Sequence, residues 1–393
     1  MRFLRAQFLT QRFNQPAKRW SSSATAGLQA NLVRVTKNES PKALVANKDL
    51  IFGRTFSDHM ITAEWSIEKG WDAPEIRPYD KICLDPSAVV FHYASECFEG
   101  MKAYKDKQGK IRLFRPDMNM ARMNRSTARI ALPQFDGDEL LKLIGDYLKV
   151  DERWIPEGRG YSLYLRPTMI GTQESLGVAA SNRAMLFVIG SPVGPYYPTG
   201  FSAISLKATT EYVRAWPRGT GDSKIGGNYA PGLLPQLMAA KKGYQQNLWL
   251  FGEQDQLTEV GAMNLFVLWK NEQGEVELAT PPLDGSILPG VTRDSILSLA
   301  RSWGEFKVSE RKLTMPQLRD AVKENRVLEV FGAGTACIVT PVKTIEYMGE
   351  DLHIPLDPND PTSQAGPITK RVNDTIMDIQ YGEIEHPWSV VVN

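Results

Sequence analysis

The sequence predicts a mixed α/β protein built from two domains, and three observations support this. The chain has 393 residues, of which 42% are hydrophobic, so it can bury more than one core. In its second half, strand-like runs alternate with amphipathic helical segments. Residues 192–200 contain three prolines and two glycines and are expected to form an interdomain linker. We therefore place an N-terminal domain at 40–191 and a C-terminal domain at 201–393.

The elements of the first domain follow from local periodicity. Leu140, Ile144 and Leu148 share one stripe of a helix, and Asp117 is expected to cap the helix before it. Residues 52–65 show the looser two-residue alternation of a strand. The expected elements are strand 52–65, helix 91–104, strand 111–114, helices 117–130 and 138–150, and strands 161–170 and 185–189.

The second domain alternates between the two kinds of element, without an internal repeat or a low-complexity tract. Short apolar runs predict strands at 203–209, 248–251, 265–269 and 327–331. Longer amphipathic stretches predict helices at about 230–243, 292–303, 314–325 and 363–380.

The first residues of the chain differ from the rest in composition. Every charged residue before Glu39 is basic, and Leu4 and Phe8 can share a helical face ahead of serines 21–23. This pattern is typical of an organelle transit peptide, which we place at residues 1–20. We predict a location in the mitochondrial matrix. Plastid leaders have a similar composition, so a plastid location is less favoured but fits the same pattern. The simpler alternative is that these residues form a disordered basic tail.

Composition excludes several classes of function. Removing residues 1–20 leaves 41 Lys and Arg against 45 Asp and Glu, which gives no support for nucleic-acid binding. No apolar run approaches the ~20 residues of a membrane span. The three cysteines and four histidines are scattered, so neither a disulfide framework nor a metal site is expected.

The most informative residue is Lys224, which lies in a glycine-rich loop at 218–231. Glycines allow close approach of the backbone to a ligand and positive φ angles. A lysine in such a loop can bind an anion or, when desolvated, act as an amine nucleophile. An ordinary surface turn has the same local pattern, so further signals must decide.

Three other segments complement the lysine. Residues 288–297 form a Pro-Gly turn that leads into a helix, whose free N–H groups suit phosphate. Residues 331–336 form a strand followed by a glycine-rich turn that carries the hydroxyl of Thr335. Glu259 is an acid expected near the end of a buried strand. Together these groups match the needs of pyridoxal 5'-phosphate: an amine for its aldehyde, donors for its phosphate and a carboxylate for its ring nitrogen.

Several blocks in the same order resemble the branched-chain amino-acid aminotransferases, which are fold-type-IV pyridoxal-phosphate enzymes. The resemblance runs from about residue 50 to the C-terminus. The matching blocks are Phe-Gly-Arg-Thr-Phe-Ser-Asp-His-Met at 52–60, Phe-His-Tyr-Ala-Ser-Glu-Cys-Phe-Glu-Gly-Met-Lys-Ala-Tyr at 91–104, Arg-Leu-Phe-Arg-Pro-Asp-Met-Asn-Met-Ala-Arg-Met at 112–123, Tyr-Leu-Arg-Pro-Thr-Met-Ile-Gly-Thr at 164–172, Lys-Ile-Gly-Gly-Asn-Tyr-Ala-Pro at 224–231 and Leu-Thr-Glu-Val-Gly-Ala-Met-Asn at 257–264.

The resemblance implies a cofactor site between the two domains. Lys224 would bind the aldehyde covalently and carry the proton between the substrate Cα and the cofactor. Tyr229 would hydrogen-bond the ring hydroxyl, and Glu259 would pair with the ring nitrogen. The phosphate would be held by Arg122, Val291, Thr292 and Thr335.

The resemblance also implies a substrate pocket and a homodimer. Arg166 would meet the distal carboxylate of glutamate, because such a charge cannot be buried unpaired among aromatic walls. Leu176 and Val178 are expected to reach into the site of the partner subunit. The other residues expected to line the pocket are Phe52, Tyr93, Phe98, Tyr164, Tyr196, Ala262, Thr335 and Ala336.

Two positions depart from the family pattern. Some animal relatives carry Cys-x-x-Cys as a thiol switch, whereas this chain has Cys337 and Thr340, so that disulfide cannot form. Ala262 stands where many relatives have threonine, which removes a hydroxyl from the pocket.

The function implied is reversible transfer of the amino group of L-leucine, L-isoleucine or L-valine to 2-oxoglutarate. A D-amino-acid aminotransferase or an aminodeoxychorismate lyase of the same fold is the first alternative, and a non-enzymatic anion-binding protein is the second. The direction in the cell and the preference among the three substrates stay open.

Overall fold

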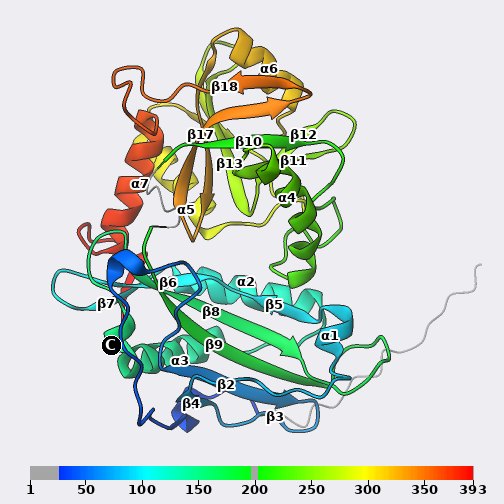
Figure 1. Cartoon of the computed structure of the whole chain (residues 1–393), viewed down its shortest axis with the longest axis vertical. Coiled ribbons are helices and arrows are strands. Elements are labelled where there is room, and N and C mark those ends of the chain that lie inside the picture. The colour runs from blue at the N-terminus through cyan, green and yellow to red at the C-terminus, as the bar shows by residue number, and fades with distance from the viewer. Residues whose placement is uncertain (1–25, 196–201, 393) are drawn as a thin grey trace, which may run out of the picture.

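The computed structural model describes residues 26–195 and 202–392, so the expected leader and most of the expected linker lie outside the described residues. Two β-sheets of ten and nine strands organise the chain, and Figure 1 shows them one above the other. This agrees with the expected mixed α/β class. The last strand returns to the first sheet, since β19 pairs antiparallel with β7.

The first sheet has the order β1-β4-β2-β9-β8-β6-β7-β19, with β3 paired to β2 and β5 paired to β8. Helices α2 and α3 share one buried core with this sheet. Its strands are β1 (Arg34–Val35), β2 (His59–Ser66), β3 (Gly70–Trp71), β4 (Glu75–Pro78), β5 (Glu96–Phe98), β6 (Met101–Lys105), β7 (Ile111–Phe114), β8 (Ser162–Gly171), β9 (Arg183–Val193) and β19 (Ser389–Val391), and its helices are α1 (Val89–Tyr93), α2 (Pro116–Arg129) and α3 (Gly137–Val150).

The second sheet has the order β12-β11-β10-β17-β16-β13-β14-β15, with β18 paired to β17. A further pairing of β12 with β13 closes six of these strands into a barrel. Its strands are β10 (Ile204–Thr209), β11 (Gln246–Phe251), β12 (Gln256–Val260), β13 (Met263–Lys270), β14 (Val276–Thr280), β15 (Lys307–Glu310), β16 (Val327–Gly334), β17 (Ile338–Tyr347) and β18 (Glu350–His353), and its helices are α4 (Leu233–Lys241), α5 (Val291–Trp303), α6 (Met315–Lys323) and α7 (Pro367–Gln380).

Two cores support the second sheet. One joins the barrel strands to α6, and the other packs α5 and α7 against β13, β14 and β16. Short 3-10 helices complete the described chain at Ala30–Leu32, Asn47–Asp49, Glu152–Trp154, Gly226–Asn228 and Ala230–Gly232. No helix of the described ranges has the length and apolar character that crossing a membrane requires.

Helix boundaries follow capping chemistry. The side chain of Asp136 accepts a hydrogen bond from the N–H of Asp138 and so begins α3, whose apolar stripe is fully buried. Helix α2 differs from the expectation, because its N-cap is Arg115 in a left-handed conformation and Asp117 lies inside the first turn. Helix α5 follows Gly290 with no side-chain cap, which leaves its first N–H groups free for a ligand.

The expected helix at 91–104 is wrong. Helix α1 ends at Tyr93, Ala94 takes a left-handed conformation, and β5 and β6 follow. Both strands pair with β8, so tertiary pairing overrides the local helical pattern. The expected strand at 52–65 is right only from His59 onward.

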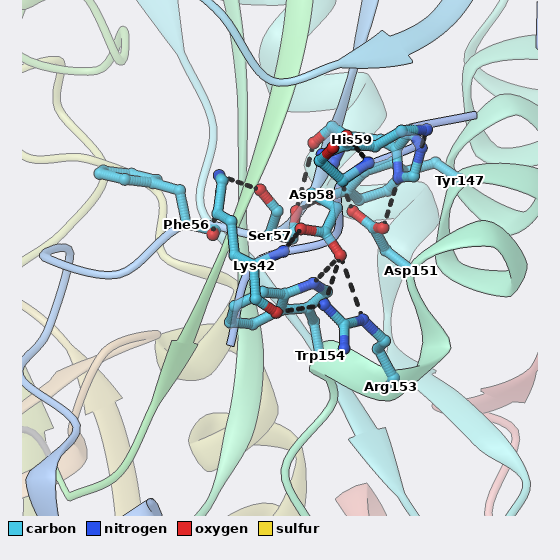
Figure 2. Close-up of polar contacts among 11 residues, drawn as sticks. Lys42, Phe56, Ser57, Asp58, His59, Tyr147, Asp151, Arg153 and Trp154 are labelled. Carbon is cyan, nitrogen blue, oxygen red and sulfur yellow. Dashed lines mark hydrogen bonds and ion pairs between the residues drawn. The ribbon is translucent and has the colours of Figure 1, made fainter. Parts of the chain in front are cut away.

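A buried polar cluster holds the segment before β2 in place (Figure 2). Asp58 accepts hydrogen bonds from the N–H of Lys42 at 2.9 Å, from Trp154 Nε1 at 2.9 Å and from Arg153 Nη2 at 2.7 Å. Beside it, His59 Nδ1 lies 2.6 Å from Asp151 Oδ1. These contacts anchor the loop that precedes His59.

We predict that Asp58→Asn destabilises the fold. The pKa of Asp58 lies below its usual range: burial acts to raise it, but hydrogen bonds from Lys42, Trp154 and Arg153 and the charge of Arg153 outweigh burial. Losing this carboxylate should cost about 3 kcal/mol of unfolding free energy at pH 7. Because the folded pKa is depressed, this contribution exists above the ordinary pKa and is lost as pH falls through the folded pKa.

Urea unfolding of the wild type and the variant between pH 7 and pH 3 measures this difference. Asp49→Asn, at an exposed position, is the control and should change little. A difference between Asp58→Asn and wild type that does not shrink in acid would contradict the assignment.

Candidate active site

A cavity of about 580 Å³ is lined by residues from both halves of the chain. The first half contributes residues between Phe52 and Arg166, and the second contributes residues between Lys224 and Cys337. In Figure 1, α2 lies on the side of the first sheet that faces the second half. The expected cofactor residues Lys224, Tyr229, Glu259, Arg122, Val291, Thr292 and Thr335 all line this cavity.

The backbone of the lysine loop is attached to the first sheet. The N–H of Phe98 on β5 donates to the carbonyl oxygen of Lys224 at 3.0 Å. The N–H of Lys224 donates to Ser126 Oγ on α2 at 2.9 Å. Ile225 forms a bridge with Cys97 and belongs to the first core. The lysine is therefore held by the half of the molecule that it does not belong to in sequence.

Most of the glycines around Lys224 lie in close contact with neighbouring atoms. None of Gly219, Gly221, Gly226 and Gly227 has positive φ, whereas Arg218 does. At Gly226, an added Cβ would lie 1.5 Å from Glu96 Oε1. The expectation of positive φ in these glycines is thus wrong. Gly219, Gly221 and Gly226 instead leave space for neighbouring atoms, whereas a Cβ at Gly227 would meet nothing within 4 Å.

The amine of Lys224 points into the cavity. Its Nζ donates to Tyr229 Oη at 3.1 Å and lies 4.9 Å from the ring centroid of Phe98. The rings of Phe98 and Tyr229 have centroids 5.0 Å apart. An amine beside a phenol and an aromatic face is positioned to react with a bound carbonyl group.

Glu259 supplies a buried carboxylate from β12, where it was expected near the end of a buried strand. It is 2% exposed and pairs with Arg214 Nε at 2.7 Å. Its Oε1 accepts hydrogen bonds from the N–H of Leu288 at 2.8 Å and from Asn264 Nδ2 at 3.1 Å. Burial raises its pKa, and the charge of Arg214 opposes that rise. Sequence reasoning missed Arg214, because nothing local links it to a residue 45 positions away.

Arg122 on α2 supplies a buried cation. Its Nε and Nη2 donate to the two oxygens of Glu99 at 2.7 and 2.8 Å, and its Nη1 donates to the carbonyl oxygen of Pro289 at 3.1 Å. The contact with Pro289 places the guanidinium just before α5. Burial alone would raise the pKa of Glu99, but the charge and hydrogen bonds of Arg122 hold it below its usual range.

An anion can therefore bind between Arg122 and the start of α5. Val291 and Thr292 begin that helix, and Thr335 lies in the turn between β16 and β17. Uncapped N–H groups, a positive helix end, a hydroxyl and a guanidinium are the donors that a phosphate group prefers.

Most of the aromatic residues in the cavity come from the first half, and Tyr229 comes from the second. The rings of Phe52 and Tyr164 meet edge to face with centroids 4.9 Å apart. Arg166 Nη2 donates to Tyr164 Oη at 3.1 Å, and its guanidinium carbon lies 4.6 Å from the centroid of Phe98. Gly100 makes room here, since a Cβ would lie 2.2 Å from Tyr164 Oη. Ala262 and Ala336 also line the cavity.

Comparisons with known proteins show the family. Residues 96–345 match the family model of amino-transferase class IV. A branched-chain-amino-acid aminotransferase of Dictyostelium discoideum is 55% identical over 97% of this chain and 100% of its own length. A cytosolic enzyme of that name from Saccharomyces cerevisiae is 55% identical over 93% of this chain and 98% of its length. The chain belongs to the branched-chain amino-acid aminotransferases.

Solved structures show the same fold. The branched-chain amino-acid aminotransferase of Escherichia coli superposes with a TM-score of 0.68 at 25% identity, covering 84% of this chain and 99% of that one. A Thermobaculum terrenum enzyme described in its pyridoxal-phosphate form gives a TM-score of 0.64 at 22% identity, with coverage of 84% and 98%.

Of the residues expected in this aminotransferase's own pocket, Tyr93 is not among those that line the cavity, and Leu176 and Val178 were expected to reach the partner's pocket instead. Tyr93 on α1 is 41% exposed, and its hydroxyl donates to the carbonyl oxygen of Leu176. Leu176 and Val178 are 67% and 83% exposed on the loop between β8 and β9. Tyr196 lies outside the described residues.

Lys102 makes a contact between the two halves that the sequence did not predict. From β6 of the first sheet, its Nζ donates to the carbonyl oxygen of Ala336 at 2.8 Å, and so reaches the cavity turn of the second half. Burial lowers the pKa of Lys102 to about 8. Its motif, Glu-Gly-Met-Lys, supported the family resemblance but gave no indication of this contact.

We predict that Lys102→Met changes how stability depends on pH. The folded state releases the lysine proton near pH 8, whereas the unfolded chain keeps it to the ordinary value of 10.5. The unfolded state then binds more protons between these values, so wild type should gain stability relative to the variant as pH rises. The expected gain is about 2 kcal/mol between pH 8 and pH 10.

Denaturant unfolding of both proteins at the two pH values measures this gain, and comparison with the variant cancels other titrating groups. A constant difference between the two proteins would show that Lys102 is not desolvated as described.

Proposed function

We propose that this protein reversibly transfers the amino group of L-leucine, L-isoleucine or L-valine to 2-oxoglutarate, with pyridoxal 5'-phosphate as cofactor. The observation that carries this proposal is the donation of Lys224 Nζ to Tyr229 Oη at 3.1 Å in the cavity that also holds Glu259 and Arg122. Relatives that are 50% to 55% identical carry the corresponding name.

The donor set of the cavity fits the cofactor. Lys224 would bind its aldehyde, Tyr229 its ring hydroxyl and Glu259 its ring nitrogen. Each oxygen of Glu259 can accept more than one hydrogen bond, so its bonds to protein leave capacity for a ligand. The phosphate would be held by Arg122, Val291, Thr292 and Thr335.

When bound, pyridoxal 5'-phosphate supplies an electron-accepting ring that eases loss of the substrate Cα proton. Lys224 Nζ would take up that proton from the substrate Cα and deliver it to the cofactor. Phe98 and Tyr229 flank the amine and limit the approach of water to it. Arg214 holds Glu259 in position for the ring nitrogen.

One pocket would serve two kinds of substrate. Branched aliphatic side chains fit against Phe52, Phe98 and Tyr164, where apolar burial favours them. Glutamate and 2-oxoglutarate bring a second carboxylate, for which Arg166 offers a bidentate partner. Ala262 leaves the pocket without a hydroxyl at that position.

Regulation by a disulfide next to the site is not expected. Cys337 lines the cavity, and burial raises the pKa of its thiol. The residue three positions on is Thr340, which cannot form a disulfide.

We also propose a homodimer in which the loop with Leu176 and Val178 completes the partner's pocket. The strong exposure of these apolar side chains supports the proposal, because an apolar loop tip is commonly covered in an assembly. Phe91 on the neighbouring α1 is 61% exposed and extends the apolar surface.

A location in the mitochondrial matrix is proposed from residues 1–20, which are rich in arginine and free of acids. Relatives from Saccharomyces cerevisiae are named both cytosolic and mitochondrial. Import of a reporter fused to residues 1–40 tests the leader directly, and a cytosolic reporter would refute it.

We predict that Lys224→Ala abolishes transamination. Purified wild type should show a visible absorbance band that shifts with L-leucine and returns with 2-oxoglutarate. The variant should lose this band and at least about 10³-fold in turnover, because it lacks the covalent attachment and the proton carrier.

Lys241→Ala, at an exposed lysine outside the cavity, is the matched control and should behave as wild type. A panel of D-amino acids and aminodeoxychorismate tests the alternative activities of this fold. Turnover of these compounds without turnover of L-leucine would overturn the proposal.

We predict that Val178→Asp weakens the dimer. A charge at an apolar contact that the proposed dimer would bury should raise the dimer dissociation constant at least about tenfold. Sedimentation of dilute protein measures this, and KM for L-leucine should rise as the loop leaves the partner's pocket. Val178→Ser, at the same exposed position, adds a polar group without a charge and is the milder control. A monomeric wild type with full activity would contradict the assembly.

A further inference from the structure

Arg166 is held firmly but lacks a counter-ion in direct contact. Its Nη2 donates to Tyr164, while its Nε is buried and has no hydrogen-bond partner among the described residues. Within the same ranges Arg166 forms no salt bridge. The guanidinium therefore keeps capacity for a ligand, and its charge needs compensation from elsewhere in the cavity.

Glu96 is the carboxylate available for that compensation. It begins β5, lines the same cavity as Arg166 and is half-buried. Burial raises its pKa, and the positive charge of Arg166 opposes that rise. Its side chain makes no hydrogen bond or ion pair with any described residue.

The other charges that line the cavity have partners or nearby opposite charges, and Lys224 interacts through space with Glu99 and Glu259. Arg122 pairs with Glu99, Glu259 pairs with Arg214, and Lys224 donates to Tyr229. Glu96 and Arg166 remain, and they interact through space without touching. Gly226 permits this arrangement, because a Cβ there would lie 1.5 Å from Glu96 Oε1 and would displace the carboxylate.

We propose that Glu96 sets the balance between apolar and dicarboxylate substrates by acting as the counter-charge of Arg166. When a leucine side chain fills the pocket, Glu96 keeps the guanidinium from being an uncompensated cation in a partly desolvated site. When 2-oxoglutarate or glutamate binds, its second carboxylate pairs with Arg166 and is repelled by Glu96. The inference rests on the proposed function, since it deepens the substrate recognition of that same pocket.

Charge repulsion of this kind acts on one substrate class only. An aliphatic side chain carries no charge, so Glu96 does not repel it. A dicarboxylate meets Arg166 and Glu96 together, and its affinity reflects the difference between attraction and repulsion. Removing the negative charge should therefore strengthen binding of dicarboxylates selectively.

The test is Glu96→Gln, which keeps the size of the side chain over Gly226 and removes its charge. KM for 2-oxoglutarate and L-glutamate should fall about threefold to tenfold, while KM for L-leucine stays equal or rises. Glu253→Gln removes the same charge at an exposed turn outside the cavity and should leave both values unchanged. Glu96→Asp keeps the charge and should stay nearer to the wild-type ratio.

Binding of unreactive probes separates this inference from the proposed function. Calorimetry with glutarate and with 4-methylpentanoate should show tighter binding of glutarate alone in Glu96→Gln. An unchanged affinity ratio, or an equal change in Glu96→Asp, would overturn the role of Glu96. A wild type that binds both probes but does not transaminate L-leucine would instead refute the proposed function.

Discussion

The attachment of the lysine loop to the first sheet is the constraint on which the site depends. Lys224 belongs by sequence to the second half, yet its backbone is bonded to Phe98 and Ser126 of the first. Glu259 sits in the barrel of the second half. The distance between the amine of Lys224 and the carboxylate of Glu259 therefore depends on how the two halves pack together. The hydrogen bond from Lys102 to Ala336 is a further contact between the halves.

The buried ion pairs of the cavity each form within one half of the chain. Arg122 and Glu99 both come from the first half, and Glu259 and Arg214 both come from the second. Each half can therefore bury its own charges before the cavity is complete, which avoids an isolated ion in a low-dielectric region. What remains for a ligand is the amine of Lys224, the free end of α5 and the guanidinium of Arg166.

The sequence predicted those parts of the fold that local periodicity determines. The amphipathic stripe located α3, and the Pro-Gly turn located the start of α5. It failed between residues 91 and 104, where pairing with β8 decides the structure. Salt-bridge partners such as Arg214 were not predictable either, because a partner distant in sequence leaves no local pattern. The residues proposed to bind the cofactor were named because several blocks resemble one family, and they line one cavity.

Close packing between the blocks explains why each block depends on the others. Gly100, next to Glu99, is small because Tyr164 of another block fills the space beside it. Gly226, two residues after Lys224, is small because Glu96 lies against it. A side chain at either glycine would move a cavity residue that belongs to a different block. Gly100 and Gly226 are thus required by packing between segments, and the geometry of the cavity depends on that packing.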